Sequence, residues 1–165
     1  MDFNVDYMSA VLGCEYTDGT IHYFDEIRQT NSNTEEMARE MKKIAPNAPV
    51  YPDAAGSARS TTSHRSDHQI LRDHGFHVVS MKANPPIIDR LNALNRMLKD
   101  ANGKIRMTVD PKCTYLIKDL EQVQRSRDGK IDKSNIALTH MLDACSYYIS
   151  YRHPIINRKP VSVEW

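Results

Sequence analysis

The sequence has 165 residues, of which 40% are hydrophobic and 26% are charged, with a formal net charge of +1. This composition is typical of one globular domain that is long enough to bury a core. No apolar run approaches the length of a transmembrane helix, and the first residues, MDFNVDYM, lack the order of a signal peptide, so an intracellular protein is the default expectation.

The first third of the chain predicts a hairpin, a helix and a short strand. Residues 8–16 and 20–27 are rich in β-branched and aromatic residues and flank a TDG turn. Residues 32–45 repeat apolar side chains at helical spacing behind a possible capping box. Residues 48–53 favour a strand, because the prolines there exclude a helix.

The rest of the chain alternates helices and strands. The apolar pattern predicts helices over 66–74, 85–98, 114–124 and 135–151, and strands over 76–82 and 104–110. Gly75 directly follows the first of these helices, where a C′ glycine is common. The order predicts an α/β fold with a mixed central sheet, in which antiparallel hairpin strands join parallel strands and helices cover both faces.

The charge is unevenly distributed along the chain. Residues 1–56 contain ten acidic and four basic residues, whereas residues 57–165 contain 11 acidic and 18 basic ones. The second part is therefore a candidate surface for a polyanion. A solvated basic exterior is an equally good interpretation, because the positive charges are dispersed singly.

Two acidic residues stand in positions that need an explanation. Asp53 falls where a predicted strand ends and a loop opens, which is the edge where α/β sheets place ligands. Asp143 lies in an apolar helical run, where an unpaired carboxylate is costly to bury. A shared divalent cation would satisfy both, since carboxylates are the hard ligands that Mg²⁺ and Mn²⁺ prefer. For either residue alone, a helix cap, a turn or an ion pair is the more common role.

Several familiar sites are not indicated. The run GSARSTTSHR (56–65) offers small, hydroxylated and basic residues that suit phosphate, but no GxxxxGK[ST] or GxGxxG occurs, so the chain alone is not a kinase or motor ATPase. His64 and His68 have zinc-compatible spacing around Asp67, without a third ligand nearby. The odd, widely spaced cysteines indicate no disulfide framework.

The chain resembles a known family, the C-terminal nuclease domain of the large terminase subunit of tailed bacteriophages, within the RNase H-like superfamily. The resemblance covers nearly the whole chain and is fairly specific when its motifs are taken in order. These motifs are DFNVDYMSAVLG, DEI, NTEEMAREM, VYPDAAGSARSTTSHRSDHQIL, NPPIIDRLNALNRML followed by VDPKC, and THMLDACSYYI.

The resemblance implies a catalytic site built from three metal-binding carboxylates. Matching motif to motif assigns them to Asp2 on the central strand, Asp53 at the end of the neighbouring parallel strand, and Asp143 on the helix that crosses the site. Two Mg²⁺ or Mn²⁺ ions would be the cofactors. His140, one helical turn before Asp143, could orient a carboxylate or contact DNA, and Glu26 could approach the metals, although a half-buried histidine and a strand-end charge are equally good interpretations.

The implied activity is metal-dependent endonucleolytic cutting of concatemeric double-stranded viral DNA during packaging. The alternatives are a catalytically silent module that docks on DNA or the portal, and another RNase H-like nuclease such as a resolvase or transposase core. The implied partners are double-stranded DNA, the terminase ATPase domain, the small terminase subunit and the portal protein, in the host cell cytoplasm and without a membrane. The candidates for contacts to the DNA backbone are Arg59, Arg65, Arg96 and Lys112.

One departure from the family concerns the first strand. The family has several apolar residues before the first aspartate, whereas only Met1 precedes Asp2. We therefore interpret residues 1–165 as a single nuclease domain that is a fragment of a larger terminase, without the ATPase domain and the start of the first strand. A frayed first strand would leave Asp2 poorly fixed beside the N-terminal amine.

Overall fold

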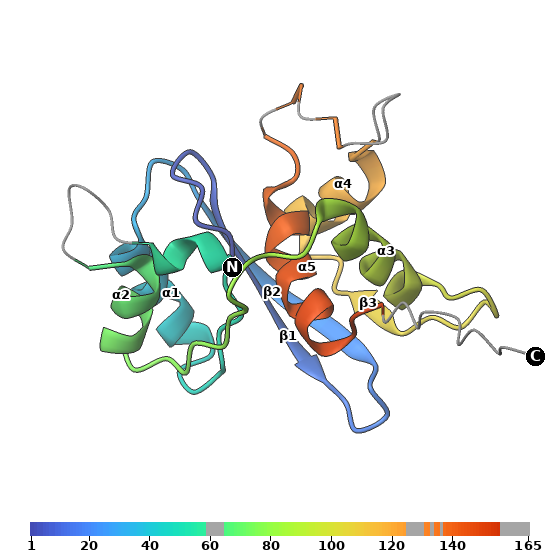
Figure 1. The fold of residues 1–165 in the computed structure, drawn as a ribbon, viewed down its shortest axis with the longest axis horizontal. Coiled ribbons are helices and arrows are strands. Elements are labelled where there is room, and N and C mark those ends of the chain that lie inside the picture. Colours follow the sequence, from blue (N-terminus) through green and yellow to red (C-terminus); the bar gives the residue numbers. More distant parts are fainter. Residues whose placement is uncertain (59–64, 125–130, 133, 136, 156–165) are drawn as a thin grey trace, which may run out of the picture.

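A hairpin and one short strand form the regular sheet of the protein. The structure is a computed structural model that describes residues 1–58, 65–124, 131–132, 134–135 and 137–155. In it, β1 (Met8–Glu15) pairs antiparallel with β2 (Ile21–Gln29), and β2 pairs in parallel with β3 (Met107–Val109) (Figure 1). The predicted mixed sheet is therefore confirmed.

The sheet is extended beyond β1 by single pairings of backbone. Asp2 forms an antiparallel bridge with Ser9. On the other side, the Met1 amine donates to the Tyr51 carbonyl oxygen at 3.1 Å, and the Asp53 N–H donates to the Met1 carbonyl oxygen at 3.0 Å. Val50 in turn forms a parallel bridge with Val78. Residues 1–2 therefore lie between β1 and the segment that carries Asp53.

The prediction of regular strands is wrong for two segments. The segments 48–53 and 76–82 contribute only the bridge between Val50 and Val78. The prolines at 49 and 52 lack the N–H groups that a longer ladder would need. The strand predicted over 104–110 is likewise shorter, because only Met107–Val109 pairs with β2.

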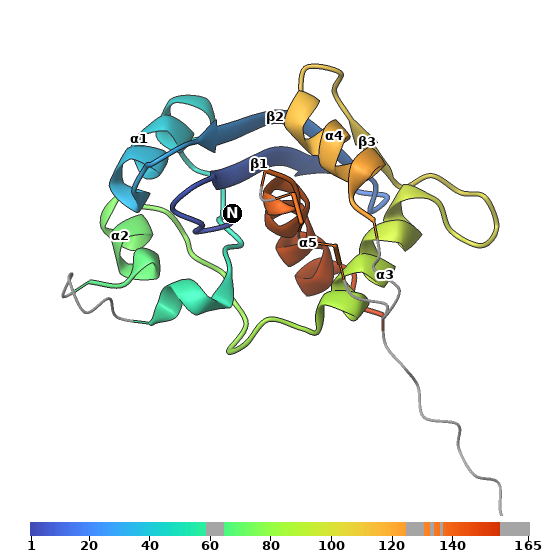
Figure 2. The same cartoon turned by 90° about the horizontal axis from the view of Figure 1, so that it is seen from above.

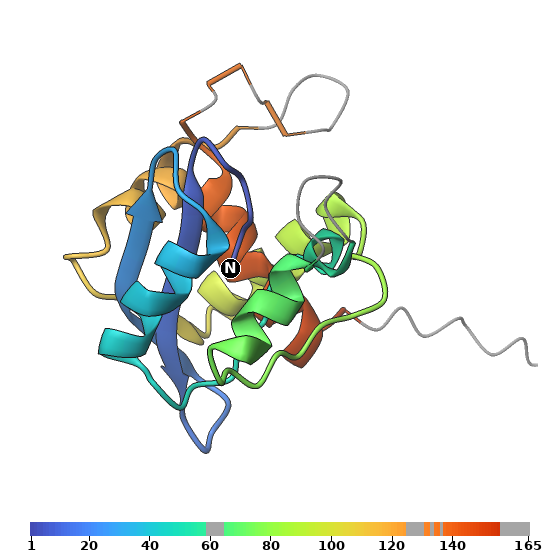
Figure 3. The same ribbon diagram turned by 90° about the vertical axis from the view of Figure 1, so that its left-hand side faces the viewer.

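Helices cover both faces of the sheet, as predicted. On one side lie α1 (Thr34–Ile44) and α2 (Asp67–Asp73), with a 3₁₀ turn, η1 (Ala54–Ser57), and on the other lie α3 (Ile87–Leu98) and α5 (His140–Arg152). Figure 3 shows α1 in front of the strands and α5 behind them. In Figure 2, α4 (Thr114–Gln122) lies close to β2 and β3.

Alternating side chains of β1 supply two separate apolar clusters. Met8 and Ala10 pack with residues of α1 and α2, whereas Val11 packs against the cluster formed by α3, α4 and α5. This alternation is the period of two that a strand covered on both sides requires. None of the helices in the described ranges combines the length and apolar character that a bilayer crossing needs.

Local chemistry explains where two of the helices begin. The Asn33 side chain accepts a hydrogen bond from the Glu36 amide at 3.0 Å, so α1 begins with an N-cap as the capping pattern predicts. The helix predicted over 135–151 begins later, at His140, because Thr139 has a φ of +85° that no α-helix accommodates.

Helix α5 is the central element, because most of its residues are buried. It is held near each end by an acidic residue of another element. Asp119 of α4 accepts hydrogen bonds from the Met141 and Leu142 amides at 2.9 and 3.1 Å. Glu15 of β1 accepts one from the Tyr148 hydroxyl at 2.6 Å and forms an ion pair with Arg152 at 3.0 Å. The buried residues of α5 are Met141, Leu142, Ala144, Cys145, Ser146, Tyr147, Ile149 and Ser150.

Gly75 provides a first test of the fold. It follows the C-cap of α2 with a φ of +75°, a conformation that favours glycine, so the predicted C′ glycine is confirmed. We expect Gly75→Ala to lower the free energy of unfolding by about 1 kcal/mol, because the added Cβ disfavours this backbone conformation. Urea denaturation followed by circular dichroism measures the change, and an unchanged or increased stability would contradict the assignment.

Candidate active site

Asp2 is fixed in the sheet rather than frayed. It is 7% exposed, and its backbone bridge to Ser9 has N–O distances of 2.8 and 3.1 Å. Its Oδ2 lies 3.0 Å from His140 Nδ1, so the imidazole N–H donates to the carboxylate. His140 therefore contacts the Asp2 carboxylate, and a functional role of this contact stays a prediction.

Asp53 is oriented by donors from three directions. Its Oδ1 accepts hydrogen bonds from the Ala55 amide at 2.8 Å and from Asn84 Nδ2 at 2.6 Å, while Oδ2 accepts one from the Tyr147 hydroxyl at 3.1 Å. The Asn84 amide oxygen accepts from the Ala54 N–H at 3.0 Å. Asn84 therefore connects the first amide of η1 to the Asp53 carboxylate through two hydrogen bonds.

The backbone of Asp53 is held by a buried histidine. His68 Nε2 lies 2.8 Å from the Asp53 carbonyl oxygen, so this nitrogen must carry a proton and donate. Burial lowers the pKa of His68, which keeps the imidazole neutral in this contact. His68 therefore has a structural role, while His64 lies outside the described residues.

Asp143 carries a buried ion pair. Its Oδ1 accepts a hydrogen bond from Arg90 Nη1 at 2.8 Å, and the two side chains are 13% and 6% exposed. The same Arg90 nitrogen lies 2.6 Å from Ser146 Oγ, and the guanidinium lies 4.7 Å from the centre of the Tyr147 ring. Asp143 is thus compensated by a cation from α3.

Tyr147 is the common neighbour of the three aspartates. Its pKa is raised first by burial and then by the negative charges of Asp143, Asp2 and Asp53. All three carboxylates are connected to α5, which carries Asp143 and contacts Asp2 through His140 and Asp53 through Tyr147. The phenol stays protonated and donates to Asp53.

The chemistry of these groups suits a hard divalent cation, since all three ligands would be carboxylate oxygens. Their present arrangement is not that of a finished metal site. Among residues 1–58, 65–124 and the described part of 131–155, no group of three or more His, Cys, Asp or Glu side chains could hold a metal ion. In the structure, His140, Tyr147 and Arg90 each contact a different one of the three carboxylates.

Glu26 is engaged at the start of another helix. Its two carboxylate oxygens accept hydrogen bonds from the Tyr115 and Leu116 amides at 2.9 and 2.8 Å. These are among the unpaired N–H groups at the start of α4, so Glu26 acts there as a helix cap supplied by β2. The contacts do not bring it together with the three aspartates.

The predicted DNA-binding residues have protein partners where they are described. Arg65 forms ion pairs with Glu35 and Asp73 at 2.9 and 3.0 Å. Arg96 donates to the His153 carbonyl oxygen at 3.0 Å, and Lys112 lies 3.3 Å from Asp25. Arg59 lies outside the described residues, together with most of the predicted phosphate-binding run.

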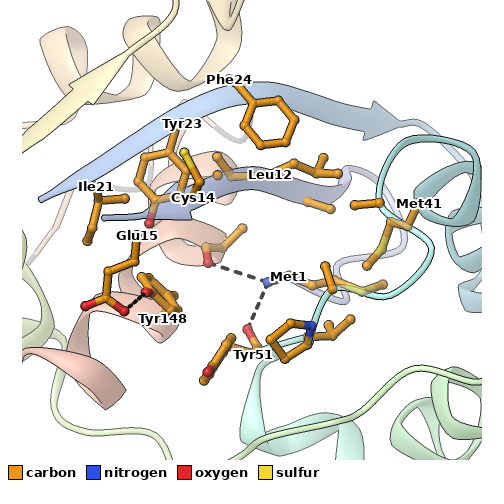
Figure 4. Close-up of a pocket in the computed structure, with 18 of the residues that line it drawn as sticks. Met1, Leu12, Cys14, Glu15, Ile21, Tyr23, Phe24, Met41, Tyr51 and Tyr148 are labelled. Carbon is orange, nitrogen blue, oxygen red and sulfur yellow. Dashed lines mark hydrogen bonds between the residues drawn. The ribbon is translucent and has the colours of Figure 1, made fainter. Parts of the chain in front are cut away.

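A cavity of about 490 Å³ lies beside this cluster of acids. Figure 4 shows the Met1 amine there, donating to the carbonyl oxygens of Tyr51 and Ala144 at 3.1 and 3.5 Å. Burial lowers the pKa of this amine to about 6. The cavity is lined by Met1, Phe76 and residues of β1, β2, α1, α5 and the segment before Pro52, and not by the three aspartates, so it is separate from the candidate active site.

Sequence reasoning missed the residues that hold the carboxylates. Arg90 looks like an ordinary polar residue of an amphipathic helix, and Asn84 like a loop residue before two prolines. Tyr147 was detectable in principle, because it follows Asp143 by one helical turn and shares its face. Asp119 also had no local signal, since its partners are backbone amides of α5.

Comparison with known proteins identifies related sequences and folds. A family model described as the terminase RNaseH-like domain matches residues 1–152. The nuclease domain of the P22 large terminase is 16% identical, with a TM-score of 0.64 over 92% of this chain and 84% of that one. The nuclease domain of g2p, the large terminase of bacteriophage SPP1, determined with bound Mn, has the same identity and TM-score over 91% and 82%.

A third structure, the large terminase nuclease from thermophilic phage G20c with bound cobalt, is 10% identical, with a TM-score of 0.54 over 90% of this chain and 84% of that one. No curated protein sequence matches the chain. The structural likeness confirms the predicted RNase H-like fold.

Proposed function

The chain belongs to the family of terminase RNase H-like domains, and from this premise we propose that it is a Mg²⁺- or Mn²⁺-dependent endonuclease. Its substrate would be concatemeric double-stranded viral DNA, cut during genome packaging. The observation that supports the proposal is that α5 carries Asp143 and contacts Asp2 through His140 and Asp53 through Tyr147. The Mn and cobalt bound by two similar nuclease domains support a divalent metal.

In this proposal Asp2, Asp53 and Asp143 hold two ions. When bound, such ions activate the attacking water and stabilise the leaving oxygen of a phosphodiester. The chain's own residues keep the carboxylates in place. His140 holds Asp2, and Asn84 with Tyr147 holds Asp53.

DNA would be held through its phosphates by Arg59, Arg65, Arg96 and Lys112. Such contacts position the duplex without reading its sequence, and the affinity should fall steeply with salt. Exchanging the exposed ion pairs of Arg65 and Lys112 for contacts with phosphate would cost little free energy, because surface ion pairs contribute about 0–1 kcal/mol to stability.

We place this nuclease within a larger packaging motor in the host cell cytoplasm. Its partners there would be the terminase ATPase domain, the small terminase subunit and the portal protein. The family match supports this setting in general.

A second candidate function is a catalytically silent module that docks on DNA or the portal. The buried Arg90–Asp143 ion pair favours it, because this pair satisfies Asp143 without a metal ion. Another RNase H-like activity, such as that of a resolvase or transposase, would use the same three acids on a branched or transposon substrate.

Nicking of supercoiled plasmid tests the proposal. We expect the protein to convert supercoiled DNA to open-circular and linear forms with Mn²⁺ or Mg²⁺, and to leave it intact with EDTA, because three carboxylates without an ion cannot activate water. Gel electrophoresis of samples taken over time measures the conversion. Cleavage that persists in EDTA would contradict metal dependence, and no cleavage with any divalent ion would favour the docking module.

A further inference from the structure

We propose that Arg90 is an internal cation that competes with divalent metal for Asp143. This inference rests on the proposed metal-dependent function and assigns a positioning role to a residue of α3. Arg90 would neutralise the Asp143 carboxylate when no metal is bound, and metal binding would require its guanidinium to leave Asp143.

The contacts of Arg90 place its positive charge where a cation is needed. Its Nη1 lies 2.8 Å from Asp143 Oδ1, and the two side chains are 6% and 13% exposed. A carboxylate this far from water needs a compensating charge, and Arg90 supplies it. The same charge lies over the Tyr147 ring, whose phenol contacts Asp53.

Burying the Arg90 guanidinium costs desolvation free energy, and its hydrogen bonds offset only part of this cost. Its Nε atom is buried without a hydrogen-bond partner among the described residues. Within the described ranges, its hydrogen bonds to Asp143 and to the Ser146 hydroxyl both come from Nη1. An unpaired buried donor leaves the guanidinium less stabilised than a fully hydrogen-bonded one. We therefore expect Arg90 to be displaced when another cation binds Asp143.

Electrostatics makes the two cations exclusive. A divalent ion at Asp143 would stand within a few ångströms of the guanidinium, in a site from which water is largely excluded. Like charges at that separation repel strongly when they are buried. Arg90 should therefore weaken metal binding, and metal should weaken the Arg90–Asp143 contact.

Calorimetric titration with Mn²⁺ tests the competition directly, in the absence of DNA. The informative variant is Arg90→Gln, which removes the charge and retains an amide donor for Asp143. We expect Arg90→Gln to bind Mn²⁺ about tenfold more tightly than the wild type, and its melting temperature without metal to be lower. Arg90→Lys, which retains a charge, should stay close to the wild type. Arg72→Gln, at an exposed position of α2, is the matched control and should bind like the wild type.

The outcomes separate this inference from the proposed function. Equal or weaker Mn²⁺ binding by Arg90→Gln, beside clear binding by the wild type, overturns the competition and leaves the metal-dependent function intact. Absence of Mn²⁺ binding in all variants overturns both. Binding by Arg90→Gln but not by the wild type supports the competition in its strongest form.

A second measurement needs no substitution at Arg90 that could impair folding. The buried Nε–H group of Arg90 should give a slowly exchanging NMR signal in the metal-free protein, because it is shielded from water. Titration with Mg²⁺ should shift this signal and speed its exchange as the guanidinium leaves Asp143. A signal that stays unchanged while Mg²⁺ saturates the protein would overturn the inference.

Discussion

Replacing Asp53 with asparagine is expected to reduce Mn²⁺-dependent nicking of plasmid DNA by about 100-fold or more. A metal-activated nucleophile and leaving group supply several kcal/mol of transition-state stabilisation, and about 3 kcal/mol corresponds to about 100-fold in rate. Asparagine retains one carbonyl oxygen, which can accept from Ala55 and Asn84 as Asp53 Oδ1 does. The loss should therefore come from the missing charge and not from unfolding.

Glu40→Gln is the matched control for this measurement. Glu40 lies on α1, its side chain is 41% exposed, and it pairs with Lys43 at 2.7 Å, outside the proposed site. Initial nicking rates and melting temperatures should be compared for the wild type and both variants. Equal nicking by wild type and Asp53→Asn would remove Asp53 from the chemistry, and equal loss in both variants would point to a general charge effect.

Asp119→Ala is expected to lower the free energy of unfolding by about 2–3 kcal/mol, because it leaves two buried amides without an acceptor. Asp119 is 3% exposed, and its Oδ2 accepts from both Met141 and Leu142 at the start of α5. Thr139 offers no side-chain cap that could replace it. Guanidinium denaturation followed by circular dichroism measures the change.

Asp119→Asn separates the hydrogen bonds from the charge. Burial raises the pKa of the Asp119 carboxyl, and the backbone donors of α5 oppose this shift, so the ionised group is costly in its site. Asparagine retains one oxygen for both amides without that cost, and we expect its stability to stay within about 1 kcal/mol of the wild type. A loss in Asp119→Asn as large as in Asp119→Ala would contradict a role through the oxygen acceptor.

The parts of the fold that could be predicted from the sequence are those with local causes. The hairpin follows from two β-rich runs around a tight turn, and the start of α1 follows from the Asn33 cap. The segment 48–53 was predicted as a strand from the same propensities, but its ladder depends on a neighbour and on donors that proline lacks. The start of α5 depends on Asp119, which is about 20 positions away, and no local pattern indicates it.

The candidate site divides in the same way. The three aspartates are predicted from motifs, and the structure connects each of them to α5. The residues that contact these aspartates could not be predicted. Arg90, for example, occupies a position on an amphipathic helix that an exposed polar residue could equally occupy. Glu26 was expected near the metals because it resembles a recurrent acid of the family, whereas its contacts are with the first amides of α4.

The position of α5 has a consequence for how mutations combine. This one helix carries His140, Asp143 and Tyr147, and it is anchored by Asp119 at its start and by Glu15 near its end. A shift of the helix would move all three side chains as one body. Pairs of substitutions, one at an anchor and one in the site, should therefore show non-additive effects even though the two residues do not touch. Double-mutant cycles on such pairs would measure the coupling free energy between the anchors of α5 and the site residues that this helix carries.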